Sequence, residues 1–182
     1  MKFISFNHDN SQKFGIIENN LITDLTGQID GALSLKELIK IKKIKEAKEY
    51  AKSNPGSIKL DQIKYSPLIP NPGKIICVGL NYSEHVKETN RTVEENPVIF
   101  HRFPESQTAH MQAIQRPTVS ESLDFEGEMA VIMGEGGKHI KPEDALKRIV
   151  GFSCYNESTI REWQRHTRQF GMGKNFEKTG SF

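Results

Sequence analysis

The sequence predicts an α+β chain whose larger, C-terminal part is mostly β-sheet and whose smaller N-terminal part mixes strands with helix. Short apolar runs flanked by turn residues, which are typical of strands, recur through the second half of the 182 residues. That half has one further predicted helix, from Pro142 to about Val150, with proline in its first turn. Few helices among strand-rich motifs are typical of the α+β class.

Residue periodicity predicts the N-terminal elements. Residues 2–6 and 13–17 alternate in hydrophobicity across a polar turn, which predicts a hairpin. Ser34 and Glu37 have the spacing of a helix capping box, and apolar residues keep a helical period to about Ser53, so one helix is predicted there. No aromatic residues or arginines interleave with the lysines of this helix, which favours a solvated face over a nucleic-acid surface.

Three prolines between residues 67 and 73 predict a rigid connection between two domains. We therefore predict a small N-terminal domain over residues 1–66, a linker over 67–73 and a catalytic domain over 74–182.

Composition indicates which classes of partner and which cell compartment to expect for this chain. The formal net charge is +2 and no apolar run reaches the length of a membrane span, so neither nucleic acid nor a membrane is an expected partner. The first residues lack the features of a signal peptide. Cys77 and Cys154 both lie in apolar runs and are expected to be free thiols, so a reducing, cytoplasmic location is predicted.

Two acids mark the chemistry-bearing segment, Leu-Asp-Phe-Glu-Gly-Glu-Met-Ala-Val-Ile-Met-Gly at residues 123–134. Side chains two residues apart in a strand project from the same face, so Glu126 and Glu128 are expected to point to one place. Adjacent carboxylates repel each other unless a cation or a shared proton lies between them. A hard divalent cation would resolve the repulsion, and so would basic neighbours on a solvated strand face. The pair alone leaves both interpretations open.

Five segments in sequence place this pair in a wider pattern. Besides the acidic segment they are Lys74–Glu88 (Lys-Ile-Ile-Cys-Val-Gly-Leu-Asn-Tyr-Ser-Glu-His-Val-Lys-Glu), Gly151–Glu157, Arg161–Gln164 and Gly173–Phe176. In this order and at these intervals they resemble the fumarylacetoacetate hydrolase family, in its branch of enzymes for small 2-oxo acids and diketones. The resemblance covers the chain from about residue 70, and the first part is loosely similar to the N-terminal domain of many members. It implies a mostly β catalytic domain, a homodimer and, because relatives continue past this C-terminus, an incomplete β-roll.

The resemblance implies that Glu126, Glu128 and Glu157 bind one divalent cation, Mg²⁺ in the first place, with Mn²⁺ or Ca²⁺ as alternatives. Most relatives carry Asp where this chain has Glu157, and the extra methylene lengthens the reach of the carboxylate. Ca²⁺ or Mn²⁺ would accept that change more readily than octahedral Mg²⁺. Three carboxylates leave coordination positions open for a substrate with two neighbouring oxygens.

The resemblance also assigns a general base. His85 and Glu88 are three residues apart, so they would share one face of a short helix, and in the family this pair activates water. A surface histidine beside an ordinary acid is the alternative interpretation.

Basic and amide side chains complete the expected site. Lys174 follows two small glycines and would stabilise an oxyanion or a substrate carboxylate. Gln164 matches a position that contacts substrate oxygens, and Arg161 is expected to be an ion-pair partner. Arg102 would face an acidic substrate or lie on the surface.

Together, these residues predict a metal-dependent hydrolase that cleaves a C–C bond in a small acidic 1,3-diketone or acylpyruvate-type substrate. One alternative is an isomerase or decarboxylase of a 2-oxo or 2-hydroxy-diene acid on the same scaffold, which needs no hydrolytic water. Another is an inactive, truncated metal-binding fragment. A nucleic-acid module built on the basic helix ranks last.

Overall fold

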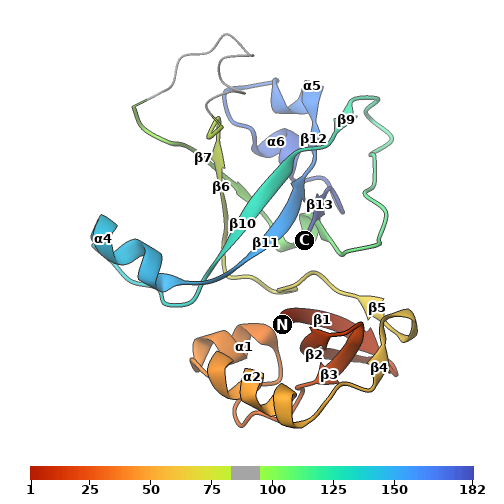
Figure 1. The fold of residues 1–182 in the computed structure, drawn as a ribbon. Helices are drawn as coiled ribbons and strands as arrows, with labels where there is room; N and C mark the ends of the chain where they lie inside the picture. The colour runs from red at the N-terminus through yellow and green to blue at the C-terminus, as the bar shows by residue number, and fades with distance from the viewer. Residues whose placement is uncertain (83–94) are drawn as a thin grey trace.

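The computed structural model describes residues 1–82 and 95–182. A sheet with two helices forms the N-terminal body, and short strands with few helices form the second body, which confirms the predicted α+β class (Figure 1). In the described ranges no helix is long and apolar enough to cross a membrane.

The N-terminal sheet has the strand order β4-β3-β2-β1-β5. The predicted hairpin is confirmed: β1 and β2 pair antiparallel from Lys2 opposite Ile17 to His8 opposite Ser11. Asp9 and Asn10 close it with φ angles of 50° and 58°, as a two-residue turn requires if it is to match the strand twist. The strands are β1 (Lys2–His8), β2 (Ser11–Glu18), β3 (Leu21–Asp24), β4 (Ile58–Lys59) and β5 (Lys64–Tyr65).

Two helices, α1 (Leu35–Lys40) and α2 (Ile44–Ser53), replace the one helix that the periodicity predicts. Lys42 adopts a φ of 61°, and this left-handed residue breaks the helix. The predicted cap is confirmed, because Ser34 Oγ accepts a hydrogen bond from Glu37 N at 3.2 Å. Both helices pack on one face of the sheet around a core that includes Phe14, Ile16, Leu25, Leu38 and Ala47.

Residues 66–74 contain no helix or strand and include the predicted linker. The segment is nevertheless held at several points. Ser5 Oγ donates to Leu68 O at 2.7 Å, Leu68 N donates to Phe182 O at 3.2 Å, and Gln107 Nε2 donates to Ile69 O at 3.4 Å. These bonds fasten the connection to both bodies.

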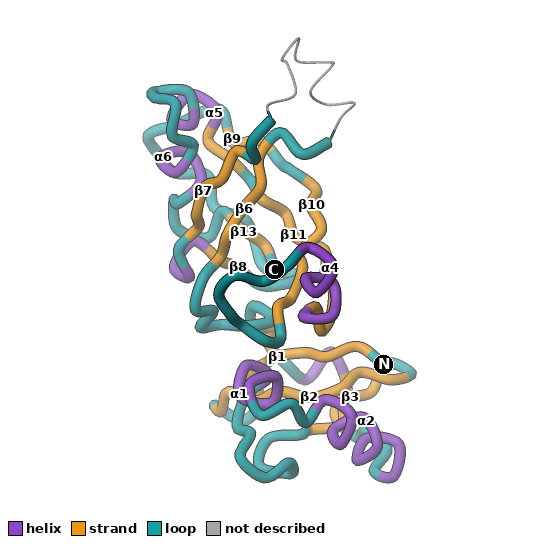
Figure 2. Tube along the Cα trace, turned by 90° about the vertical axis from the view of Figure 1, so that its left-hand side faces the viewer, coloured by secondary structure: helices purple, strands orange, loops and turns teal. Residues whose placement is uncertain are grey.

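The second body is built around a long antiparallel pair, β10 (Gly127–Met133) and β11 (Ile149–Glu157), within a four-stranded sheet of order β10-β11-β13-β8. The pairs β6–β7 and β9–β12 lie beside it (Figures 1 and 2). These strands are β6 (Ile75–Gly79), β7 (Val98–Arg102), β8 (Gln107–Thr108), β9 (Leu123–Asp124), β12 (Thr159–Ile160) and β13 (Gly180–Ser181).

In the described part of the second body there are three short α-helices: α4 (Pro142–Ala145), α5 (Arg161–Gln164) and α6 (Gly171–Lys174). The helix predicted from Pro142 is confirmed, although it continues as a 3₁₀ turn over Leu146–Arg148 and gives way to β11 at Ile149. α5 and α6 lie close together beyond the end of β11 (Figure 1).

Candidate active site

Two acidic side chains meet at one end of the β10–β11 pair. Gly127 lies opposite Asn156 in the register, so Glu126, which precedes β10, and Glu157, which ends β11, are brought together. Glu157 N donates to Glu126 O at 2.8 Å, which fixes the two backbones beside each other. Exposure alternates along this segment: Phe125 and Met129 are 77% and 63% exposed. Glu126 and Glu128 are both on the less exposed side, as the strand period predicts.

Lys174, from α6, bridges the two carboxylates. Its Nζ lies 2.8 Å from Glu126 Oε2 and 2.6 Å from Glu157 Oε2, and it also donates to Glu157 O at 3.2 Å. The lysine is 1% exposed, so its charge is neutralised by these acids rather than by water. Gly173 allows this approach, because a Cβ there would lie 2.5 Å from Gln164 N and 2.7 Å from Ile160 O.

Two arginines occupy the outer oxygens of the same carboxylates. Arg161 Nη1 lies 2.8 Å from Glu126 Oε1, and Arg161 Nε lies 2.8 Å from Asp124 Oδ2. Arg102 Nη1 lies 2.6 Å from Glu157 Oε1. The result is a continuous chain of alternating charges, Asp124–Arg161–Glu126–Lys174–Glu157–Arg102. Such a network keeps buried ions partnered on both sides.

The low exposure of this region shifts the pKa values of two side chains, Glu157 and Cys77. Burial raises the pKa of the Glu157 carboxyl above its ordinary value, and the nearby charges of Lys174 and Arg102 oppose that shift without cancelling it. Burial, reinforced by the negative charge of Glu157, raises the pKa of the Cys77 thiol to about 12. Cys77 is therefore a neutral thiol beside the charged network at neutral pH.

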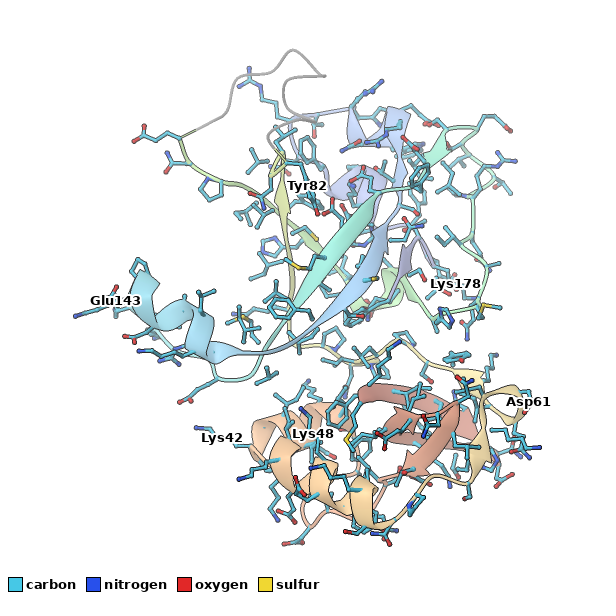
Figure 3. All side chains as sticks on the ribbon, in the orientation of Figure 1. Lys42, Lys48, Asp61, Tyr82, Glu143 and Lys178 are labelled. Atoms are coloured by element: carbon cyan, nitrogen blue, oxygen red, sulfur yellow. The ribbon has the colours of Figure 1, made fainter. Side chains whose placement is uncertain are left out.

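Glu128, on β10, interacts with Tyr82, which follows β6 at the side of the site. The charge of Glu128 raises the pKa of the Tyr82 phenol, which also hydrogen-bonds to this carboxylate. Tyr82 lies just beyond the end of β6 (Figure 3). Glu128 also contributes, after burial and other charges, to the shift of the Cys77 pKa, so it belongs to the same electrostatic neighbourhood as Glu157.

The donor chemistry fits a hard divalent cation, because three carboxylates, one just before β10, one on β10 and one at the end of β11, offer only oxygen ligands, and two of them already converge on a positive charge. As the side chains stand in the described ranges, no three acidic, histidine or cysteine groups come close enough together to hold an ion. Lys174 Nζ lies at the point where Glu126 and Glu157 meet. An ion coordinated by both would require these side chains to rearrange.

The structure brings together only some of the residues singled out from the sequence. Glu126, Glu157 and Lys174 are in direct contact, and Gln164 Oε1 accepts from Arg161 Nη1 at 3.0 Å. The expected ion-pair role of Arg161 is confirmed.

His85 and Glu88, the predicted general base, lie outside the described residues. Arg102 differs from both predicted placements, a contact with an acidic substrate and a surface position. It is 2% exposed, and protein groups occupy all three of its nitrogens. The strand-like segment alone could not reveal this burial, because the side chain is covered by residues far along the chain.

Three neighbours of the site were not singled out from the sequence. Asp124, which anchors Arg161, lies two residues before Glu126, and the same period-two rule that links Glu126 to Glu128 could have identified it. Cys77 and Tyr82 carry no such signal, since their approach depends on how β6 packs beside β10 and β11.

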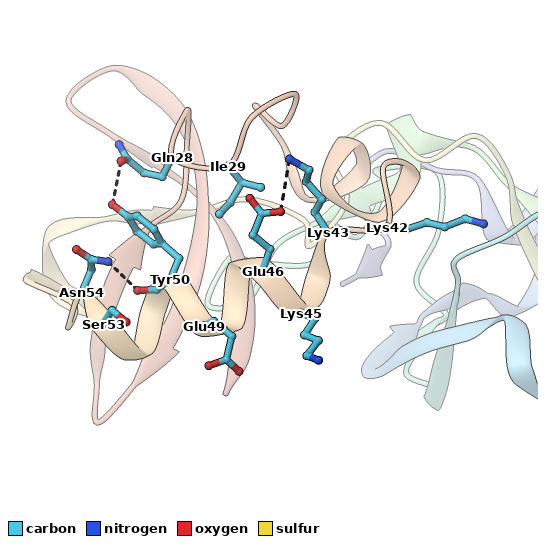
Figure 4. Close-up of a pocket in the computed structure, with 10 residues that line it drawn as sticks. All are labelled: Gln28, Ile29, Lys42, Lys43, Lys45, Glu46, Glu49, Tyr50, Ser53 and Asn54. Carbon is cyan, nitrogen blue, oxygen red and sulfur yellow. Dashed lines mark hydrogen bonds and ion pairs between the residues drawn. The ribbon is translucent and has the colours of Figure 1, made fainter.

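A separate hollow of about 750 Å³ is lined entirely by residues of the N-terminal body (Figure 4). Charged side chains on its wall pair with each other, as Lys43 Nζ does with Glu46 Oε2 at 3.4 Å. It is open and holds none of the candidate catalytic residues, so we assign no role to it. Its lining residues are Gln28, Ile29, Lys42, Lys43, Lys45, Glu46, Glu49, Tyr50, Ser53 and Asn54.

Comparison with known families gives a match over the whole second body. The family described as fumarylacetoacetate (FAA) hydrolase C-terminal matches residues 74–182. Oxaloacetate tautomerase Fahd2a, mitochondrial, of Rattus norvegicus is 39% identical over 117 residues, which make up 64% of this chain and 37% of the relative. Oxaloacetate tautomerase FAHD2A, mitochondrial, of Homo sapiens is 36% identical over 118 residues, or 64% of this chain and 38% of the relative. The chain thus spans well under half the length of these curated relatives.

Solved structures match nearly the entire chain. A fumarylacetoacetate hydrolase from Exiguobacterium antarcticum superposes with a TM-score of 0.75 at 29% identity, covering 99% of this chain and 64% of that one. A maleylpyruvate hydrolase from Sphingobium sp. SYK-6, in complex with manganese(II) ion and pyruvate, has a TM-score of 0.78 at 20% identity, covering 100% of this chain and 64% of that one. The second likeness is one of fold alone.

Proposed function

Because the chain belongs to the fumarylacetoacetate hydrolase family, we propose that it is a divalent-metal-dependent enzyme acting on a small acidic 2-oxo acid or 1,3-diketone. The observation that supports this proposal best is the convergence of Glu126 Oε2 and Glu157 Oε2 on one cationic point. Two buried or half-buried acids held around a positive charge form a centre that favours cations.

Glu126, Glu128 and Glu157 would hold the metal in this proposal. A bound divalent cation would polarise a substrate carbonyl and stabilise the negative charge of an enolate. Magnesium is the expected ion, with manganese and calcium as alternatives, because all three accept carboxylate oxygens.

The chain's own cations would orient the substrate. Lys174 keeps a buried ammonium within 2.8 Å of Glu126 and 2.6 Å of Glu157, next to the expected substrate oxygens. Arg161 fixes Gln164 by a 3.0 Å hydrogen bond while it pairs with Glu126, so the amide of Gln164 is held in place for a substrate contact. A pre-oriented donor costs little reorganisation when charge develops on a substrate oxygen.

Tautomerisation of a 2-oxo acid is the first candidate reaction. It moves one proton between a carbon and an oxygen atom and consumes no water. The relatives described as oxaloacetate tautomerases, 36% and 39% identical over the matched region, support it.

Hydrolytic C–C cleavage, the reaction expected from the sequence, is the second candidate. The three-residue spacing of His85 and Glu88 supports it, because such a pair can serve as the base that activates water. An isomerase or decarboxylase would use the same carboxylates without that base.

The test compares two assays, the ketonisation of enol-oxaloacetate followed by ultraviolet absorbance and the hydrolysis of acylpyruvates. With Mn²⁺ or Mg²⁺ present, Glu126→Gln is expected to lower kcat/KM in the active assay by at least about 100-fold. His85→Ala should abolish hydrolysis and spare tautomerisation. The matched control is Glu121→Gln, since Glu121 is 90% exposed. If E126Q remained as active as E121Q, the proposed metal chemistry would be wrong.

The cytoplasmic location stays a prediction, and the relatives whose names include the word mitochondrial make the mitochondrion its alternative. The homodimer likewise stays part of the proposal. One face of β10 and β11 exposes Met129, Val131 and Phe152, and this apolar surface is of the kind that a second subunit covers.

A further inference from the structure

We propose that Arg102 is a positioning residue that fixes the carboxylate of Glu157, so that one oxygen of that carboxylate stays turned toward Lys174 and Glu126. The inference rests on the proposed function for its meaning in catalysis. The geometry that supports it involves the chain's own side chains only.

The guanidinium of Arg102 holds one oxygen of Glu157 and leaves the other for the site. Nη1 donates to Glu157 Oε1 at 2.6 Å and to Ser158 O at 3.0 Å. The second oxygen, Oε2, lies 2.6 Å from Lys174 Nζ. When one carboxylate oxygen is held by a charged hydrogen bond, the other oxygen has a defined direction, because rotation of the carboxylate would break that bond.

Arg102 is itself locked by contacts on its other nitrogens. Nε donates to Ser106 Oγ at 3.2 Å and Nη2 donates to Thr179 Oγ1 at 2.8 Å. The Arg102 side chain is fully buried, and the Tyr155 ring lies 6.0 Å from its central carbon. The planar fork thus has a partner in every direction, which a lysine ammonium could not reproduce.

The sheet is shaped to admit this fork. Gly180 in β13 lies directly opposite Glu157 in the β11 register. A Cβ at Gly180 would lie 2.3 Å from Tyr155 Oη and 2.8 Å from Arg102 Nη2, so the backbone packs against the guanidinium with no room for a side chain. β13 therefore pairs with Glu157 and also packs against Arg102, the residue of β7 that orients the Glu157 carboxylate.

The length of the side chain at position 157 explains what such a positioning residue would contribute. A glutamate has one more rotatable bond than an aspartate, so its carboxylate samples more directions when it is unrestrained. Arg102 removes that freedom at a place where ligand atoms must be held to within a fraction of an ångström. Loss of a residue that hydrogen-bonds to a metal ligand typically lowers metal affinity or activity by about 10–100-fold.

The test is Arg102→Lys, which keeps the charge and removes the fork, in the full chain. Mn²⁺ binding by calorimetry is expected to weaken by about 10–100-fold in the folded variant, with kcat falling more than KM rises. Arg116→Lys is the matched control, because Arg116 pairs with the 90% exposed Glu121. A purely structural role predicts lower stability but unchanged Mn²⁺ affinity in folded R102K, and that result would overturn the proposal.

A crystal structure of R102K separates this inference from the proposed function. We expect the Glu157 carboxylate to turn away from Lys174; an unmoved carboxylate would refute the positioning role whether or not the protein binds Mn²⁺. Absence of Mn²⁺ binding by the wild type would instead refute the metal chemistry alone. If R102K does not fold, Thr179→Val is the second variant for both measurements. It removes the 2.8 Å bond to Arg102 Nη2 together with the 2.7 Å bond that Thr179 Oγ1 donates to Phe176 O, and it should shift both measurements in the same direction by a smaller amount.

Discussion

Single residues at this site act through charge compensation. Lys174 and Arg102 are both almost fully buried, and each has a glutamate within 2.6 Å. A buried ion that loses its partner is strongly destabilising, whereas a complete pair is close to neutral. The network therefore maintains the direction of Glu157 more than it adds stability.

Glu157→Asp tests whether both oxygens of this carboxylate are held at once. Removing one methylene draws the carboxylate back by about 1.5 Å, so it can no longer reach Arg102 and Lys174 together from the same backbone position. The buried cation left short of a partner should lower the free energy of unfolding by about 1–3 kcal/mol, measured by urea denaturation. Glu121→Asp, on an exposed residue, should change it by less than about 0.5 kcal/mol. An E157D protein as stable as the wild type would show that one of the two ion pairs is absent.

The raised pKa of the Cys77 thiol predicts that its reactivity depends on pH. Its pKa of about 12 means that the thiolate, which is the reactive form, is scarce at pH 8 and increases as the pH rises toward 12. Iodoacetamide at pH 8 should therefore modify the exposed Cys154 and spare Cys77 in the folded protein, as peptide mass spectrometry would report. In urea both should react. Equal labelling of the two cysteines in the folded protein would mean that the half-buried Cys77 thiol is not protected by its surroundings.

Local elements follow their sequence signals closely where the determinants are local. The hairpin of β1 and β2 and the cap at Ser34 were predicted, because turn chemistry and capping operate over a few residues. The break at Lys42 was not, since a lysine gives no sign of a left-handed conformation. The parallel pairing of β13 with β8 was also beyond prediction, because it joins segments some seventy residues apart, Gly180 and Gln107.

The junction of α5 and α6 sets the position of Lys174. A Cβ at Gly173 would lie 2.5 Å from Gln164 N and 2.7 Å from Ile160 O, and neither backbone atom can swing away. Gly173→Ala should therefore push α6 outward, destabilise the protein by about 1–3 kcal/mol and move Lys174 from the carboxylates. The comparison is Gly151→Ala in β11, where a Cβ meets nothing within 4 Å and urea denaturation should show a change below about 1 kcal/mol. Equal stability of the two variants would contradict the close contact.

At the scale of the whole molecule, the second body holds the candidate site and the first body supports it. A backbone bond fastens Leu68 of the connecting segment to Phe182 of the second body, and Ile132 of β10 packs against the N-terminal core. The division into domains at residues 67–73 stays a prediction, although these residues contain no helix or strand. The α+β class was predictable from composition and periodicity, and the family from five short segments.

The candidate site was predictable only in part at this scale. Residues close in sequence, such as Glu126 and Glu128, follow from strand geometry. The bridging role of Lys174 and the burial of Arg102 depend on β7, β13 and α6 meeting at the end of β11, and no local pattern encodes that meeting.

A crystal of the protein soaked in Mn²⁺, examined by anomalous scattering, tests the central claim most directly. We predict a single strong peak bounded by Glu126, Glu128 and Glu157, with Lys174 displaced from its present 2.6 Å contact with Glu157. A map with no peak at these three carboxylates, and with Lys174 still bridging Glu126 and Glu157, would contradict the claim that this is a divalent-cation centre.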